Sequence, residues 1–361
     1  MHRLPRHLCR HLPSCNSSLR QAPIRQAPRS APVRLLSSTS ARKDLPAAAA
    51  ATSSPPPAAS SAAYCTSLAQ RSDHPSYLAG LLLPARSKRP FFALAALNVE
   101  TASMKSLRQD SLRNGNAAAA VKLQWWHERV ADIYEDRLDP VLLHQPLVQE
   151  LQNAIRGDPE RPLTRRFLEQ LLAARQADLA TATHESLNDL EAYVSQTQGP
   201  LLKLQLEALG VQSDGADHVA THLGMGIGLA NFLRGVPPLA AQGHVALPGE
   251  LMEKHRISSS VLLKPEERDP HDDENLRAAA FDLAVVGNEH LRHARDTFLN
   301  PESKVPAEAR GAFLRGVDAR LYFERMEVCN FDMDEARLKQ GGLGSLPVQL
   351  AKTKFFSSDP F

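Results

Sequence analysis

Apolar side chains recur at three- and four-residue intervals from about residue 64 to residue 352, and this period constrains the fold more than any other feature. Alternating strand-like runs bounded by turn residues are missing from this region. Two stretches show the period most clearly: Phe167, Leu168, Leu171, Leu172 and Leu179, and Phe281, Ala284, Val285, Leu291 and Phe298. The pattern predicts an all-α fold in a single domain of residues 64–352.

Proline and glycine divide this domain into expected helices. Pro90 falls in a first turn, where its missing N–H costs nothing. Gly199-Pro200 is expected to kink or break the helix around it, and Pro237-Pro238 to end one. The expected helices are residues 64–82, 88–108, 116–136, 141–156, 163–183, 187–209, 215–234, 273–299 and 306–329.

The first 43 residues have a composition of their own. They hold nine of the chain's 42 basic residues, none of its 40 acidic residues and no continuous apolar run. An acid-free segment rich in Arg and Ser is typical of a mitochondrial presequence, whereas a secretory signal needs an apolar core of about 7–15 residues. We expect residues 1–43 to be a presequence cleaved between Arg34 and Lys43. The alternative is a disordered basic arm that touches nucleic acid or anionic lipid.

Residues 44–63 are expected to be a linker, because the tract from Pro46 to Ala63 contains only Ala, Pro, Ser and Thr and cannot bury a core. Residues 353–361 are expected to be a tail. The segment Leu350–Phe356 is expected to be a frayed terminus, with insertion into a membrane interface as the alternative.

The composition also excludes several classes of protein. No apolar stretch approaches the roughly 18 residues of a membrane span. A net charge of +2 argues against bulk nucleic-acid binding. The four cysteines are too few and too scattered for a disulfide framework or a paired-cysteine metal site.

Two small motifs have both a chemical and a structural interpretation. Gly224, Gly226 and Gly228 almost form a dinucleotide fingerprint, but no strand precedes them, so we predict close helix–helix contact. His218 and His222 share one helix face and could bind zinc, as could the pair His290 and His293. No third ligand is evident nearby in the sequence, so the prediction is ordinary surface or core histidines, with no metal and no cofactor.

The most informative segment runs from Asn231 to Pro248. Here the chain resembles the squalene/phytoene synthase family, in which a helix ends in Asn-x-x-Arg-Asp-x-x-Glu-Asp and a Gly-Arg-x-Tyr-Leu-Pro stretch follows. The frame is retained at Asn231, Arg234, Gly243 and Pro248. The acidic positions are instead occupied by three residues without charge: Gly235, Pro238 and Leu239.

The resemblance continues upstream. The segment Phe92 to Ser106 resembles the family helix that carries Asp-Asp-x-x-Asp, with Ala102, Ser103 and Ser106 at the acidic positions. Other retained positions are Trp126 and Glu128, which fit a Trp-Arg-x-Glu helix, and Tyr193, which fits a Tyr…Gly-x-Leu helix. The resemblance implies an isoprenoid-synthase-like helical bundle.

The missing acids bear directly on activity. The family ionises prenyl diphosphates, and the Mg²⁺ ions that neutralise the leaving diphosphate need hard oxygen ligands, usually carboxylates. One or two stray acids, such as Glu100 or Glu128, would not rebuild two clusters. The resemblance therefore implies a pseudoenzyme without catalytic residues.

A presequence on such a body is similar to a mitochondrial branch of this family. Members of that branch act in building respiratory complex I (NADH:ubiquinone oxidoreductase) on the matrix side of the inner membrane. The resemblance implies complex I subunits or other assembly factors as partners, peripheral membrane contact and no nucleic acid. The alternatives are an active trans-prenyltransferase condensing farnesyl or geranylgeranyl diphosphate, and a chaperone that binds an isoprenoid or another apolar lipid.

Overall fold

The computed structural model describes residues 60–105, 115–158, 162–181, 183–339 and 345–361, and in these ranges all regular structure is helical, as predicted. The expected presequence (residues 1–43), residues 44–59 of the expected linker and Ser106 lie outside the described residues. The longer helices are α1 (Ser61–Ser72), α2 (His74–Leu81), α3 (Ala85–Ala102), α5 (Gly115–Tyr134), α6 (Pro146–Arg156), α7 (Arg165–Ala180), α8 (Leu187–Ala208), α9 (Asp214–Ala241), α12 (Pro270–Leu299), α14 (Arg315–Val328) and α16 (Leu346–Phe356). Shorter elements are η1 (Pro140–His144), α10 (Gly249–Lys254), α11 (Ser259–Leu263), η2 (Pro265–Glu267), η3 (Pro301–Ser303), η4 (Ala307–Ala309), α13 (Arg310–Phe313) and α15 (Ala336–Lys339).

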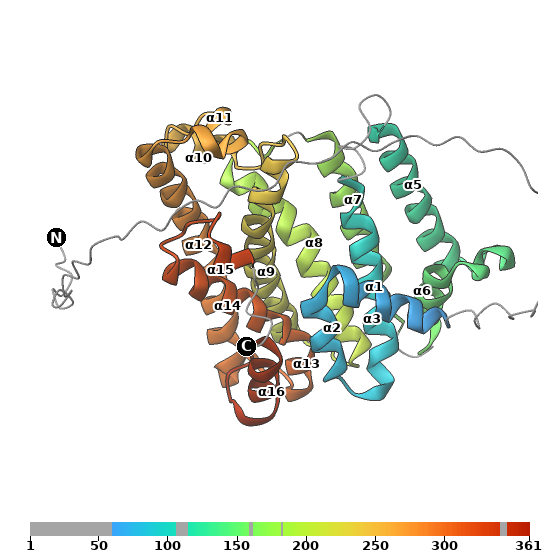
Figure 1. Cartoon of the computed structure of the whole chain (residues 1–361). Coiled ribbons are helices and arrows are strands. Elements are labelled where there is room, and N and C mark those ends of the chain that lie inside the picture. Colours follow the sequence, from blue (N-terminus) through green and yellow to red (C-terminus); the bar gives the residue numbers. More distant parts are fainter. Residues whose placement is uncertain (1–59, 106–114, 159–161, 182, 340–344) are drawn as a thin grey trace, which may run out of the picture. The chain divides into compact units, whose positions relative to one another are not determined.

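Helices α5, α7, α8, α9 and α12 follow one another through the bundle, each packed against the next (Figure 1). Helix α3 packs against α8, and α1 and α6 pack against α3. Helix α14 lies against both α9 and α12. Helix α9 therefore lies at the centre of the bundle. Its C-terminal turns carry Asn231 and Arg234, two positions expected to match the family frame.

Local sequence signals position the two helices that flank α9. Helix α8 begins with a capping box, in which Ser186 and Asp189 satisfy each other's backbone N–H groups. Helix α12 begins in the same way with Asp269 and Asp272. The interior is mainly Leu and Ala, and burying one leucine side chain stabilises the fold by about 1.5–3 kcal/mol.

Three of the glycines of α9, Gly224, Gly226 and Gly228, allow close helix contact, as predicted. A Cβ atom on Gly224 would lie 2.7 Å from the backbone nitrogen of Gly199 in α8, closer than real Cβ contacts come. A Cβ on Gly228 would lie 2.6 Å from Cβ of Val194, also in α8. Gly226 faces the other way, toward Leu291 of α12. The glycines therefore let α9 approach both of its neighbours.

The proline prediction was wrong for Pro237-Pro238, and at Gly199-Pro200 the helix does not break. Helix α8 continues through Gly199-Pro200 without a break, and α9 continues through Pro237-Pro238 to Ala241 instead of ending at Arg234. Each interior proline removes a helical hydrogen bond, at a cost of about 3 kcal/mol. Burial of Val236 and Ala240 holds the last turns of α9 on the core. Tertiary packing therefore outweighs the local preference.

The expected helix 64–82 is in fact two helices, α1 and α2, that meet at Asp73. The Asp73 carboxylate accepts hydrogen bonds from the backbone N–H and the hydroxyl of Ser76, at 3.2 and 2.7 Å. Pro75 follows in the first turn of α2. An N-cap aspartate followed by an early proline is a helix start that the sequence does contain.

The C-terminal segment is a docked helix, so the expected frayed terminus was wrong. Leu350 of α16 is buried, and the ring of Phe361 packs where Gly316 of α14 leaves room for it. The guanidinium of Arg310 donates hydrogen bonds to the backbone carbonyls of Ser357, Ser358 and Asp359 at 2.5–2.9 Å. These contacts tie the end of the chain to α13 and α14.

Candidate functional site

The retained Asn231 and Arg234 contact each other on α9. Arg234 Nη1 donates to Asn231 Oδ1 at 3.1 Å, and Arg234 Nη2 donates to Asp318 Oδ2 of α14 at 3.2 Å. The guanidinium also lies over the ring of Tyr322, 4.6 Å from its centre. Burial raises the pKa of the Tyr322 hydroxyl to about 12, although Arg234 lowers it, so this tyrosine is neutral. Arg234 thus joins α9 to α14.

The three residues expected at the acidic positions of the family motif, Gly235, Pro238 and Leu239, carry no charge. Gly235 has open space beside it, since a Cβ there would meet only Leu239 Cδ1, at 3.9 Å. Pro238 is exposed, and its ring replaces a backbone N–H. The fold therefore leaves room for an acidic side chain at residue 235 that the sequence does not supply.

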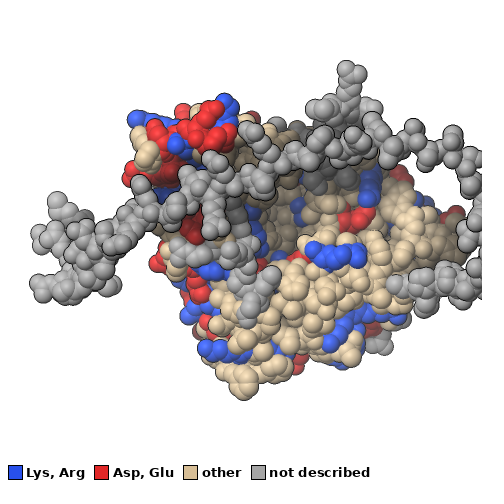
Figure 2. Space-filling view, viewed as in Figure 1, with Lys and Arg blue, Asp and Glu red and all other residues tan. Residues whose placement is uncertain are grey.

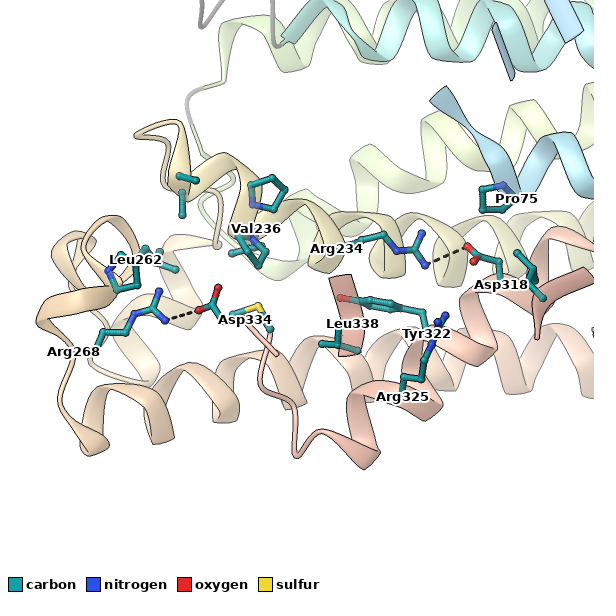
Figure 3. A pocket seen from close by; sticks show the side chains of 17 residues that line it. Pro75, Arg234, Val236, Leu262, Arg268, Asp318, Tyr322, Arg325, Asp334 and Leu338 are labelled. Atoms are coloured by element: carbon teal, nitrogen blue, oxygen red, sulfur yellow. Dashed lines mark hydrogen bonds and ion pairs between the residues drawn. The ribbon is translucent and has the colours of Figure 1, made fainter. Parts of the chain in front are cut away.

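A cavity of about 640 Å³ opens beside these turns, between α9, α14 and the short elements that follow α9 and α14 (Figure 3). Its walls are mainly apolar, with Val236, Pro237 and Pro238 on the α9 side. The two carboxylates in the described lining are both paired with arginine: Asp318 with Arg234, and Asp334 with Arg268 at 2.5 Å. With Arg325, arginines outnumber acids in this lining. The cavity suits an apolar molecule with an anionic group better than a magnesium cluster.

The residues expected to match the first acidic motif lie elsewhere, at the end of α3. Ala102 ends α3 and Ser103 caps it, both exposed, and the Ser103 hydroxyl donates to the Glu100 carbonyl at 2.7 Å. The Glu100 carboxylate forms an ion pair with Lys122 of α5 at 2.5 Å. No described residue that lines the 640 Å³ cavity comes from α3. The structure therefore does not bring the two motif positions to one described cavity.

A buried polar network lies instead between α3, α7 and α8. Arg175 donates to Asn98 Oδ1 at 3.1 Å and to the hydroxyl of the retained Tyr193. Asp178, only 5% exposed, accepts a hydrogen bond from Lys105 at 2.7 Å. Burial raises the pKa of Tyr193, so its hydroxyl remains protonated. Every charged group in this network has an internal partner of opposite charge or a hydrogen-bond acceptor.

His184 lies beside this network, with its Nε2 3.7 Å from Asp178 Oδ1 and its ring 5.4 Å from that of Tyr193. Burial lowers the pKa of His184, and nearby Asp178 only partly opposes this effect. The neighbouring loop is held in place by Thr183, whose hydroxyl donates to the Val245 carbonyl at 3.0 Å. The network thus extends to the segment that follows α9.

Sequence reasoning missed five members of this network: Lys105, Arg175, Asp178, His184 and Asn98. They are spread over 87 positions of sequence, and none belongs to a recognisable motif. Only the packing of α3 on α7 and α8 brings them together. The sequence of α7 gives a partial indication that Asp178 is buried, because Asp178 falls on the same helical face as Leu168 and Leu171.

The other positions expected to match the family frame make local contacts. Trp126 is buried, its indole N–H has no hydrogen-bond partner in the described structure, and its ring packs edge-on against Trp125. Glu128 is largely exposed, 3.6 Å from Arg129. Gly243 takes φ +83° directly after α9, a left-handed conformation that favours glycine at a helix end. Pro248 is the N-cap of α10.

The sequence matches one protein family over most of its length. The squalene/phytoene synthase family profile matches residues 69–342. The chain is 34% identical over 287 residues to a Mus musculus protein named NADH dehydrogenase (ubiquinone) complex I, assembly factor 6, and the match covers 80% of each chain.

Solved structures agree on the fold. A dehydrosqualene synthase in complex with ligand superposes with a TM-score of 0.60 at 19% identity, over 81% of this chain and 95% of that one. Squalene synthase HpnC from Alicyclobacillus acidocaldarius also gives a TM-score of 0.60, at 15% identity, over 75% of this chain and 95% of that one. At such identities the likeness concerns the fold alone.

Proposed function

This chain belongs to the squalene/phytoene synthase family, and from that premise we propose that it is a non-catalytic assembly factor for respiratory complex I in mitochondria. The proposal places it on the matrix side of the inner membrane, with complex I subunits or other assembly factors as partners. The observation that carries the assembly role is the 34% identity to the mouse assembly factor over most of both chains. The basic, acid-free segment 1–43 supports the mitochondrial location.

The loss of catalysis rests on the second motif. Ionising a prenyl diphosphate requires Mg²⁺ held by carboxylates. At this motif Gly235, Pro238 and Leu239 offer none, and the two aspartates of the adjacent cavity are each engaged by arginine. Stabilisation of the leaving group by metal is worth several kcal/mol, and each 1.36 kcal/mol changes a rate about tenfold.

A turnover assay tests the loss of catalysis. The full chain is incubated with farnesyl or geranylgeranyl diphosphate and Mg²⁺, and released diphosphate is measured. We expect no release above a protein-free control. Release that falls in Glu100→Gln or Glu128→Gln, but not in the exposed control Glu289→Gln, would instead support an active trans-prenyltransferase.

A deletion strain tests the assembly role. We expect loss of this protein to lower the amount of assembled complex I on native gels, with isoprenoid pools unchanged. Re-expression of the wild-type chain restores the complex. Normal NADH:ubiquinone activity in the deletion strain would contradict the proposal.

The apolar cavity favours a second, compatible role as a lipid-binding chaperone. Its walls are mainly apolar, and Arg268 and Arg325 lie toward opposite ends of the labelled lining (Figure 3). An isoprenoid or lipid with an anionic end group fits that chemistry. Native mass spectrometry of the full chain should detect a co-purified apolar ligand. Ala241→Trp, which places an indole in the cavity, should lower its occupancy, whereas Ala118→Trp on α5 should not.

We also propose that membrane contact is peripheral. Among the described helices none is both long and apolar enough to cross a bilayer. Helix α16 carries Val348, Lys352, Phe355 and Phe356 on an outward side, and the two phenylalanines are 64% and 84% exposed. A short helix with exposed aromatic rings and lysines is suited to an anionic lipid surface.

The surface supports this assignment. Figure 2 shows charged side chains gathered over α10 to α12, while the face over α1 and α2 is mostly uncharged, and α16 packs against α2. Flotation with vesicles that contain an anionic phospholipid tests the contact. The Phe355→Ser/Phe356→Ser variant should bind at least about tenfold more weakly, since each ring contributes about 1.5–3 kcal/mol on burial. Val121→Ser, equally exposed on α5, should bind like the wild type.

A further inference from the structure

Four histidines gather where the first turns of α9 pack against α12, about 18 Å along α9 from Arg234 at 1.5 Å per residue. His218 Nε2 lies 3.1 Å from His293 Nε2, and His222 Nδ1 lies 3.0 Å from His290 Nδ1. The sequence places His218 and His222 on one helix face but shows no third ligand. The fold supplies the third ligand from α12: His293, which lies 71 positions after His222 in the chain.

The backbone holds these rings close together. Gly226 and Leu291 bring α9 and α12 into close contact, and His290 and His293 stand on either side of Leu291. The ring centres of His222 and His293 are 4.1 Å apart. Because both helices are long and packed over their length, the cluster rests on rigid elements, as a preorganised site requires.

We propose that His218, His222 and His293 bind one divalent transition-metal ion of the zinc class. One ring nitrogen from each residue lies within 4.8 Å of the other two. Two nitrogens bound to a single zinc at tetrahedral angles are about 3.3 Å apart, given bonds of about 2.0–2.1 Å. The pair at 3.1 Å already has this spacing, and a ring nitrogen of His222 lies within 4.8 Å of both partners.

The donor set selects the metal. Imidazole nitrogen suits Zn²⁺, Cu²⁺ and Ni²⁺, whereas Mg²⁺ and Ca²⁺ prefer oxygen ligands. Three histidines leave one coordination position for water or for a ligand from a partner. His218 and His293 are exposed, so an ion from solvent can reach the site. This chemistry is distinct from the magnesium chemistry of the family's acidic motifs.

His290 and Glu191 act as positioning residues. Glu191 Oε1 of α8 accepts a hydrogen bond from His290 Nε2 at 3.0 Å. His290 Nδ1 is then an acceptor for the Nδ1–H of His222, which leaves His222 Nε2 as the nitrogen that can ligate. Metal-binding histidines ordinarily donate their other N–H to such a partner.

Zinc titration of the metal-free full chain by calorimetry tests the site. We expect one equivalent to bind tightly, with affinity reduced more than about 100-fold in His218→Ala and His293→Ala. Glu191→Gln should weaken binding by about 10–100-fold, the range for outer partners of a metal site. The exposed control His271→Ala should bind as the wild type does, and excess Mg²⁺ should not compete.

A second readout is Co²⁺, whose visible absorption bands report tetrahedral nitrogen ligation. The bands should form with the wild type and His271→Ala, and be lost in His218→Ala. Since His218 and His293 are exposed, their variants leave the core intact, and circular dichroism checks this. Tight zinc binding that is unchanged in the His218→Ala/His293→Ala double variant would overturn the proposal, as would an equal loss in His271→Ala.

Discussion

Substituting alanine at Gly224 tests a close contact between α9 and the backbone of α8. In an ordinary helix interior, Gly→Ala stabilises by up to about 1 kcal/mol. At Gly224 the new Cβ would lie 2.7 Å from the Gly199 nitrogen and 2.9 Å from the Gln198 carbonyl carbon, both rigid backbone atoms. Helices α8 and α9 must separate by roughly 0.7 Å to restore van der Waals contact, and a gap of this size forfeits a quarter to a half of each dispersion contact.

We expect Gly224→Ala to lower the free energy of unfolding by about 1–3 kcal/mol, the usual cost of overpacking. Gly235→Ala is the matched control in the same helix, because its Cβ would meet only Leu239 at 3.9 Å. This control should raise the free energy of unfolding by about 0.5–1 kcal/mol. Urea denaturation of both variants gives the two values. Changes of the same sign in both would refute the close-contact reasoning.

Three further predictions follow from buried contacts. Burial by itself would raise the pKa of the Glu150 carboxyl. The hydrogen bonds that Glu150 accepts, first from Arg89, outweigh this effect, so its pKa lies below the usual 4.5. The ionised Glu150 therefore stabilises the fold above pH 4.5, and this contribution is lost as the pH falls through the lowered pKa of the folded state. The denaturation midpoints at pH 7 and pH 3 should then differ less in Glu150→Gln than in the wild type. Arg234→Ala should lower stability by about 1–2 kcal/mol, because it removes the nearer cation from Asp318 and leaves only Arg315, at 4.0 Å; a shift of only a few tenths would contradict this. Phe361→Ala should cost about 3 kcal/mol in thermal unfolding, whereas Phe356→Ala, 84% exposed, should change little.

Much of the fold could be predicted because its signals are local. The helical period of the apolar residues indicates an all-α body, and the close contacts at Gly224 and Gly228 follow from the absence of side chains there. The retained Asn231 and Arg234 frame pointed to the family that the comparisons establish. These features depend on neighbouring positions along one helix, which the sequence displays directly.

The errors occurred where packing overrode local preference. Pro237-Pro238 are helix breakers by backbone chemistry, yet burial of Val236 and Ala240 keeps them within α9. The C-terminal segment was expected to fray because its own composition does not anchor it. The pocket that receives Phe361 is formed by α14, which a local pattern cannot reveal.

By itself, the sequence determined the helical class and indicated the family, since these depend on residue identity and on spacing within one element. It also predicts that Gly235, Pro238 and Leu239 stand where the family motif has acids. Only the tertiary structure decided which distant side chains meet. It joined Lys105 to Asp178 across the bundle, and it brought His293 to His218 and His222. The physical reason is that such contacts depend on how helices pack, and packing is set by the combined burial of many side chains rather than by any one segment.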